Sequence, residues 1–136
     1  MIVFDDLSSV SLSELMANTN WQSQYRLITQ WGKFIHPKPA LRVEDNVLRG
    51  CEARAWLGHL YHNGVHRFTF DSDSRVIKGL AVLLLSQVDN KTTEHIKNVD
   101  FHQLLLDVGL EKHLTPSRNN GLQAIVGKVR EIVSAE

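Results

Sequence analysis

The segment from Ser74 to Val88 constrains the fold most strongly, because apolar residues lie nearly all round the helix that it would form. The pattern predicts a helix that begins after a cap at Asp73 or Ser74. A helix that is apolar on all sides is stable only where other elements cover it. We therefore expect this helix to be the most buried one, and we expect Gly79 and Ala81 to let it approach a sheet closely.

Two segments, 53–61 and 65–71, have the residue types and spacing of β-strands. The Asn63-Gly64 pair between them favours a type I′ turn, since both central residues of that turn need a positive φ. Residues 47–48, just before the only cysteine, predict a third strand, so the cysteine falls in a bend between strands. We expect one face of the last strand to be dry, and it carries His66, Phe68 and Phe70.

The remaining helices are predicted from polar residues whose side chains cap a helix start. One of these helices must end before Pro37 and carries an apolar stripe at helical spacing, which is typical of a core face. The expected caps are Ser11, Asn20, Thr92 or Thr93, Asp100 and Thr115. The stripe consists of Trp21, Tyr25, Ile28, Trp31 and Ile35.

These elements predict an α+β fold, a small three-stranded antiparallel sheet with helices packed on one face. A chain of 136 residues is expected to form one domain over residues 1–136, with a core large enough to need no disulfide or metal. We find no repeat or interdomain linker in the sequence.

Charge and composition argue against several function classes. Fifteen basic and fifteen acidic residues give a formal net charge of zero without a block of one sign, so neither nucleic acid nor a membrane surface is an expected partner. The first twenty residues lack the basic start and apolar core of a signal peptide. A single cysteine excludes an intramolecular disulfide and fits a reducing compartment, so we expect a cytoplasmic protein.

Cys51, the only cysteine, is the main candidate for chemistry. It follows Gly50, whose lack of a Cβ allows backbone conformations closed to other residues. Arg49 and Arg54 flank the thiol and favour its thiolate form, whereas Glu52 opposes that effect. An inert, buried cysteine that acts only as a small hydrophobic residue is the alternative.

The seven histidines do not form a convincing metal or catalytic pattern. His59 and His62 are three residues apart on a predicted strand and therefore face opposite sides, which is unfavourable for sharing a metal. Glycine patterns typical of nucleotide-binding loops do not occur. The sequence thus predicts no metal site and no bound cofactor.

Three ordered stretches nevertheless resemble the SufE family of sulfur acceptors, and the resemblance covers the chain from about Asn20 to its end. Its Gly-Cys-Glu-x-Arg-x-Trp-Leu-Gly pattern is closer to the CsdE branch than to SufE itself. The first stretch is Asn46–Trp56, the second is Asp71–Leu80, and the third is Leu114–Leu122. An early Trp…Tyr…Gly helix, Trp21–Gly32, is also similar to that family.

The resemblance implies a SufE/IscU-like fold and a sulfur relay. Cys51 would be the nucleophile that takes persulfide sulfur from a cysteine desulfurase, a pyridoxal phosphate enzyme, and the sulfur would pass to an iron–sulfur scaffold. The protein would then be an accessory with a covalent persulfide intermediate rather than a stand-alone enzyme. Gly50 and Arg118 are supporting candidates, Arg118 either holding the thiolate or bracing the loop. Asp73 is expected to cap the apolar helix, as is Asp71, with a place beside the active loop as the alternative.

Three other functions remain open from the sequence. An iron–sulfur scaffold needs several thiolate ligands, and this chain has one cysteine. A thiol-dependent hydrolase needs a histidine within hydrogen-bond reach of Cys51. An interaction module in which the cysteine is incidental would need neither.

Overall fold

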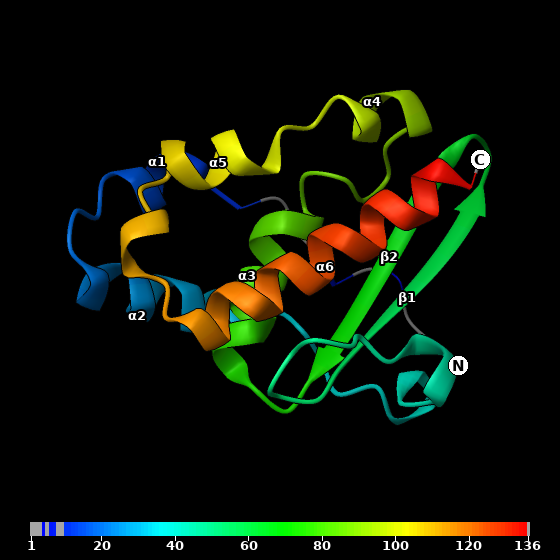
Figure 1. The fold of residues 1–136 in the computed structure, drawn as a ribbon, viewed down its shortest axis with the longest axis horizontal. Helices are drawn as coiled ribbons and strands as arrows, with labels where there is room; N and C mark the ends of the chain where they lie inside the picture. Colours follow the sequence, from blue (N-terminus) through cyan, green and yellow to red (C-terminus); the bar gives the residue numbers. More distant parts are fainter. Residues whose placement is uncertain (1–3, 5, 8–9, 136) are drawn as a thin grey trace.

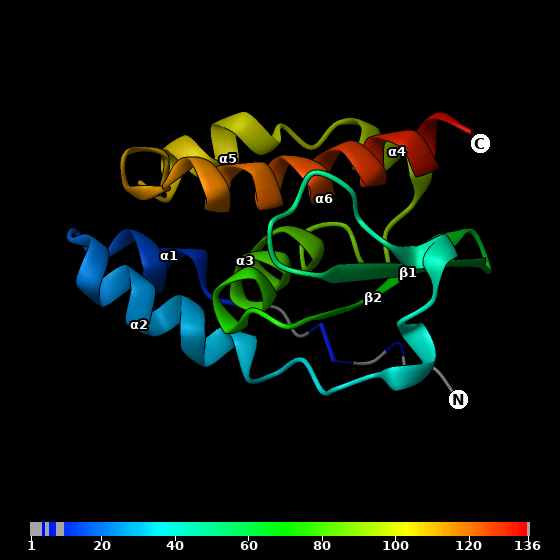
Figure 2. The same cartoon turned by 60° about the horizontal axis from the view of Figure 1, so that its bottom comes forward.

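The structure is a computed structural model that describes residues 4, 6–7 and 10–135. Its elements form three layers, with α3 and a β-hairpin between two groups of helices (Figures 1 and 2). In chain order the elements are α1 (Leu12–Met16), α2 (Trp21–Gly32), β1 (Ala55–His62), β2 (Val65–Ser72), α3 (Arg75–Leu85), α4 (Thr93–Lys97), α5 (Phe101–Asp107) and α6 (Pro116–Ser134). Short 3₁₀ turns span Pro39–Leu41, Glu44–Asn46 and Glu111–His113.

The helix α3 is the centre of the core, as its apolar sequence predicts. It packs against α2 on one side, α6 on the other and β2 along its length. In Figure 2, α2 lies below α3 and the hairpin, whereas α4, α5 and α6 lie above them. The helix ends at Leu85, and Val88 is buried in the turn that follows. The fully buried residues of α3 are Leu80, Ala81, Val82, Leu83, Leu84 and Leu85.

The expectation that Gly79 lets α3 approach the sheet is wrong. A Cβ on this residue would overlap the backbone carbonyl of Ile28, so Gly79 allows α3 to approach α2 rather than the sheet. Gly32 of α2 faces the carbonyl of Arg75 in the same way. Two glycines therefore bring the helix backbones closer together than any side chain would permit.

The predicted hairpin is confirmed. Its strands are antiparallel, with Ala55 opposite Ser72 and His62 opposite Val65. Asn63 and Gly64 have φ angles of 53° and 79°, the positive values that a type I′ turn requires.

The predicted third strand is wrong: within the described residues the sheet has two strands. Val47 pairs with Trp56 in an isolated bridge, and the N–H of Leu48 donates to the carbonyl of Ala55 at 2.9 Å. A 3₁₀ turn comes immediately before this bridge and the bend at Gly50 comes shortly after it, so the extended segment is too short for a strand.

The hairpin is covered on both faces over part of its length. His66, Phe68 and Phe70 are fully buried on the face expected to be dry. On the opposite face Thr69 and Asp71 are fully buried as well. A Cβ on Gly58 would lie 2.7 Å from Leu41 and 3.9 Å from Phe4, so the first 3₁₀ turn and the chain start cover this second face.

Most of the predicted helix starts are confirmed in detail. A side-chain oxygen at each cap accepts the N–H three residues later, and these caps are Ser11, Asn20, Ser74, Thr92, Asp100 and Thr115. Asp71 and Asp73 do not cap α3, because both carboxylates bind basic side chains instead. The stripe predicted for this helix is buried at Ile28 and Trp31, and Tyr25 is 37% exposed; α2 ends at Gly32, so Ile35 is buried in the turn that follows.

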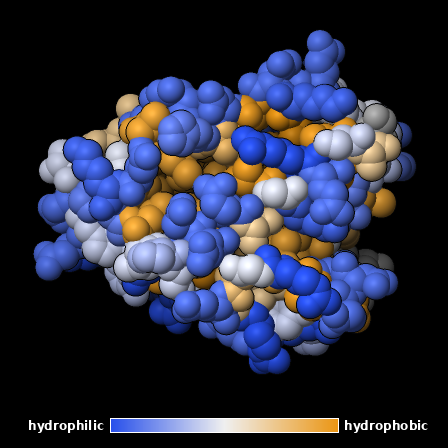
Figure 3. Space-filling view, in the orientation of Figure 1, coloured by the Kyte–Doolittle hydropathy of each residue, from blue (hydrophilic) through white to orange (hydrophobic). Residues whose placement is uncertain are grey.

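The outer face of α6 is mainly hydrophilic. Hydrophobic atoms show there in hollows between rows of polar residues (Figure 3). No helix in the described part of the chain has the length and hydropathy needed to cross a membrane.

The glycine contact between α2 and α3 leads to a stability prediction. Gly79→Ala should lower the free energy of unfolding by about 3 kcal/mol or more, because the new methyl group meets rigid backbone. Gly127→Ala on α6 is the matched control, since a Cβ there meets nothing within 4 Å. It should stabilise the protein by about 0.5–1 kcal/mol. Urea unfolding of both variants measures the difference, and equal stabilities would contradict the packing described.

Candidate functional site

Cys51 lies in a loop that joins the extended residues Val47 and Leu48 to β1, and its side chain is partly buried. Gly50 precedes it with a φ of +90°, and a Cβ on Gly50 would meet nothing within 4 Å. The glycine is therefore required by the backbone conformation and not by crowding. In Figure 2 this loop rises from the sheet to the side of α6.

Hydrogen bonds hold the loop at its base and near its tip. At the base, the carbonyl of Arg54 accepts the N–H of Asp73 at 3.1 Å and the hydroxyl of Ser72 at 2.7 Å. Near the tip, the hydroxyl of Ser117 donates to Oε2 of Glu52 at 2.8 Å. The last contact ties the residue next to Cys51 to the first turn of α6.

A pocket of about 390 Å³ opens beside the thiol. The loop, the start of α3 and the start of α6 each contribute to it. The lining residues are Cys51, Glu52, Ala53, Ser74, Val76, Ile77, Ser117 and Arg118. The second and third stretches of the resemblance thus meet the first around Cys51.

The electrostatics of the thiol differ from the expectation. Burial raises the pKa of Cys51, a hydrogen bond with the backbone of Ala53 lowers it, and the charge of Glu52 raises it, with a net rise. Arg49 pairs with Glu44, and Arg54 pairs with Asp73 at 2.6 Å. Because both arginines bind carboxylates, the expected stabilisation of the thiolate is wrong, and the loop in this conformation favours the protonated thiol.

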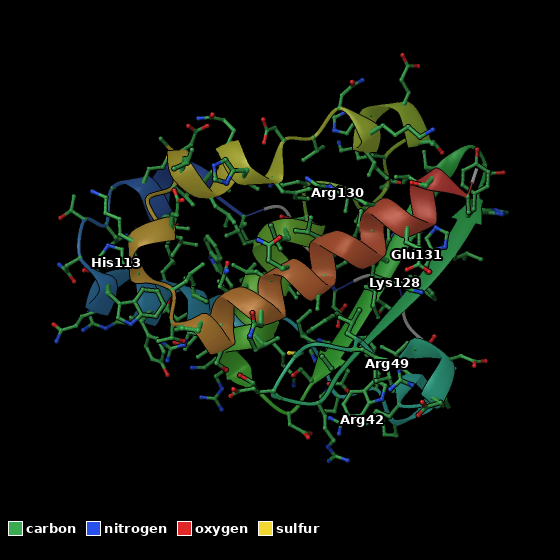
Figure 4. The ribbon with its side chains drawn as sticks, in the orientation of Figure 1. Arg42, Arg49, His113, Lys128, Arg130 and Glu131 are labelled. Carbon is green, nitrogen blue, oxygen red and sulfur yellow. The ribbon has the colours of Figure 1, made fainter. Side chains whose placement is uncertain are left out.

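A network of charges fixes the base of the loop. Asp71 is fully buried, and its Oδ2 accepts from Arg42 Nε at 2.9 Å. Arg42, which is labelled in Figure 4, also donates to Asp73 at 2.9 Å, and its guanidinium carbon lies 4.4 Å from the ring centre of Trp56. Asp73 therefore bridges Arg42 and Arg54, which explains why Ser74 and not Asp73 caps α3.

The pKa values of both carboxyl groups are lowered. Burial raises the pKa of Asp71, but the hydrogen bonds from Arg42 and from the backbone N–H groups of Lys38 and Ser72 outweigh it. Hydrogen bonds from Arg54 and Arg42 lower the pKa of Asp73. Both groups are thus carboxylates at neutral pH.

Arg118 lines two pockets. One is the pocket of Cys51, and the other is a groove on α2 that Trp21 and Tyr25 also line. The guanidinium carbon of Arg118 lies 5.2 Å from the ring centre of Trp21 and 5.4 Å from that of Tyr25. Trp21 also stacks on the ring of His113, which is labelled in Figure 4, with the two ring centres 6.0 Å apart. The arginine is thus close to the thiol, with its charge directed over an aromatic groove on α2.

Two histidines of the hairpin, His59 and His66, form a hydrogen-bonded chain with Thr93. Nε2 of His59 lies 2.7 Å from Nδ1 of His66, and Nε2 of His66 lies 2.6 Å from Oγ1 of Thr93. Within the described ranges, three or more His, Cys, Asp or Glu side chains do not come together in a group that could hold a metal ion.

Sequence reasoning missed two features of the site. Arg42 was not singled out, although it links Asp71, Asp73 and Trp56, because its carboxylate partners are about thirty residues away. The contact between Glu52 and Ser117 spans 65 positions and has no local signal. The resemblance to two separate motifs was the only available indication that these segments meet.

Comparison with known proteins identifies the family that the chain resembles. The family model described as "SufE: Fe-S metabolism associated domain" matches residues 10–133. The chain is 34% identical over 109 residues to "Sulfur acceptor protein CsdE" of Escherichia coli (strain K12), covering 79% of this chain and 74% of that protein. A solution structure of a hypothetical protein from Thermus thermophilus has the same fold, with a TM-score of 0.72 and 19% identity over 98% of this chain and 97% of that one.

The charge network leads to a prediction with an internal control. Arg42→Gln should lower the free energy of unfolding by about 2 kcal/mol, because the buried carboxylate of Asp71 loses the nearer of its two charged partners and keeps Lys78 at 3.6 Å. Arg49→Gln removes the same side chain from an exposed pair, so urea unfolding should show no change beyond experimental error. If both variants lost the same free energy of unfolding, burial of the Asp71 carboxylate would not explain the effect of Arg42→Gln.

Acid unfolding tests the same network by its pH dependence. Because the folded pKa of Asp71 is lowered, this carboxylate stabilises the fold above its ordinary pKa of about 4, and the stabilisation is lost as the pH falls through the folded value. Arg42→Gln should raise the pKa of Asp71 in the folded state, because the hydrogen bond from the guanidinium is lost. The stability difference between parent and variant should therefore narrow on acidification, and a constant difference would argue against the pairing.

Proposed function

This chain belongs to the SufE family, and from that premise we propose that it accepts sulfur from a cysteine desulfurase on Cys51. The main support is that the only thiol of the chain lies beside a pocket where all three family-like stretches meet. The relative named as a sulfur acceptor protein supports the same activity.

The proposed transfer is an exchange between a thiol and a persulfide. The Cys51 thiolate attacks the terminal sulfur of a persulfide on the desulfurase. A new S–S bond forms on Cys51 as the desulfurase S–S bond breaks, and the desulfurase cysteine leaves as a thiolate. The proton lost by Cys51 balances the one that this thiolate takes up, so no oxidant or reductant is needed.

Finer features of the pathway are also proposals. The donor is a pyridoxal phosphate enzyme, the acceptor protein itself binds no cofactor, and both act in the cytoplasm. The sulfur passes to iron–sulfur cluster assembly, which the family description supports by its reference to Fe-S metabolism.

We assign supporting roles to three residues. Arg118 lines the Cys51 pocket with its guanidinium over Trp21 and Tyr25, and we propose that the guanidinium turns from these rings toward Cys51 to favour a persulfide anion. Gly50 gives the loop the left-handed turn that presents the thiol. Asp73 holds Arg54 and Arg42 at the base of the loop, which keeps that base in place while the tip is exposed to a partner.

The alternative of a thiol hydrolase has less support. Such an enzyme needs a base that activates the thiol, most often a histidine within hydrogen-bond reach. The residues that line the Cys51 pocket, all of them in the described part of the chain, include no histidine.

The relay predicts that Cys51→Ser abolishes stimulation of the desulfurase. Alanine release from cysteine, measured with and without the acceptor, should increase with the parent protein and not with the variant. The variant should unfold in urea at nearly the parental concentration, since the exchange of sulfur for oxygen is small. Full stimulation by Cys51→Ser would contradict the relay and favour an interaction module, whereas ester hydrolysis without a desulfurase would favour the hydrolase.

A further inference from the structure

A groove along α2 adjoins the pocket of Cys51 and combines aromatic rings with positive charges. Its volume is about 530 Å³, within the range of about 300–1,000 Å³ that is usual for small-ligand sites. Arg118 lines this groove and the Cys51 pocket, so the two cavities meet at its side chain. We call it the α2 groove, and its lining residues are Trp21, Gln22, Tyr25, Arg26, Thr29 and Arg118.

The aromatic part of the α2 groove is held in place and remains accessible. The rings of Trp21 and Tyr25 meet at 68° with their centres 5.5 Å apart, and Trp21 is stacked on His113 from the other side of the chain. Tyr25 is the exposed member of the otherwise buried stripe of its helix. Two fixed rings of this kind can cover the apolar part of a ligand.

The two arginines of the α2 groove have no acidic partner. No ion pair among the described residues includes Arg26 or Arg118. Four other arginines do bind carboxylates, namely Arg42, Arg49, Arg54 and Arg67. The lining residues, which all belong to the described part of the chain, include neither Asp nor Glu. A guanidinium that packs over an aromatic ring can still bind a carboxylate through its N–H groups, so the groove fits an organic anion.

We propose that the α2 groove binds small thiols that carry carboxylate groups, and that such a thiol takes the sulfur from a persulfide on Cys51. Arg26 and Arg118 bind the carboxylates, and the two rings cover the apolar part of the ligand. The thiol enters the Cys51 pocket past Arg118, which borders both cavities. The proposal rests on the function proposed above only for the origin of the persulfide.

The transfer needs no oxidant or reductant. The thiolate of the small molecule attacks the terminal sulfur of the Cys51 persulfide. A new S–S bond forms on the small molecule as the S–S bond to Cys51 Sγ breaks, and Cys51 leaves as a thiolate. The proton that the small thiol loses balances the one that Cys51 takes up, so the products are a small persulfide and the free thiol of Cys51.

A bound carboxylate also changes what Arg118 does. When a carboxylate holds the guanidinium over Trp21 and Tyr25, its charge no longer stabilises the persulfide anion. The persulfide is then protonated more readily, and a protonated persulfide is the better target for an attacking thiolate. Binding in the α2 groove would thus favour release of the sulfur.

The test compares glutathione, which carries two carboxylates, with its diethyl ester, in which both are masked. The Cys51 persulfide is made with sodium tetrasulfide, and its loss is followed by intact-protein mass spectrometry. At equal thiolate concentration, glutathione should remove the sulfur faster by a factor of about five or more, because charge-assisted hydrogen bonds hold it beside Cys51. Equal rates would overturn the proposal. A mixed disulfide of Cys51 and glutathione as the main product would contradict attack on the terminal sulfur.

Arg26→Gln tests whether this preference arises in the α2 groove. The substitution removes one charge at an exposed position, and the ratio of the two rates should fall by a factor of about three. Arg130→Gln is the matched control. Arg130, labelled in Figure 4, also lies over a ring, that of Phe101 at 5.8 Å, but it is about 18 Å further along α6 than Arg118. The control should keep the parental ratio, and an equal fall in both variants would contradict a local site.

Binding is measured separately from sulfur chemistry with S-methylglutathione, which cannot accept sulfur. Its addition should shift the indole N–H signal of Trp21 in NMR spectra and slow the reaction with glutathione. No shift of that signal would overturn binding in the α2 groove. The persulfide is made without a desulfurase, so a desulfurase that fails to load Cys51 would overturn the function proposed above and leave this test unaffected.

Discussion

The need to cover α3 on every side determines the arrangement of this fold. A helix with Leu80–Leu85 fully buried needs a partner on each face, and α2, α6 and the hairpin provide them. The contact with α2 relies on Gly79, and the contact with α6 brings Gly121 against Ile77. The loop that carries Cys51 reaches the same place from β1. The position of the thiol is therefore a consequence of the way the central helix is covered.

The charges around the thiol contribute to the fold and do not activate the sulfur. Arg54 and Arg42 bind Asp73, and Arg42 also binds the buried Asp71, so these two positive charges at the base of the loop are neutralised. Burial consequently dominates the pKa of Cys51 and keeps the sulfur protonated. Such a site protects a thiol at rest, and it is compatible with a sulfur acceptor whose reactivity is released when a partner docks.

Local chemistry predicted the elements of the fold well, because each signal lies within a few residues. The caps at Asn20 and Thr115 and the turn at Asn63 depend on neighbouring atoms, and all three are confirmed. Features that depend on distant partners were predicted poorly. Asp73 was assigned as a cap because its partners Arg42 and Arg54 come from other segments.

The same limit applies to the sheet and to the site. Residues 47–48 have the composition of a strand but only one bridge to pair with, since the chain turns on both sides of them. Cys51 was identified from the sequence, whereas its contact with Gly121 spans about 70 positions and has no local signal. The protonated resting state also followed from packing rather than from the flanking arginines.

The central claim is that Cys51 accepts sulfur, and intact-protein mass spectrometry tests it most directly. The protein is incubated with a cysteine desulfurase and cysteine, alongside Cys51→Ser. The account predicts a gain of one sulfur atom that a thiol reductant removes, present in the parent and absent in the variant. No gain in the parent, or an equal gain in both proteins, would contradict it.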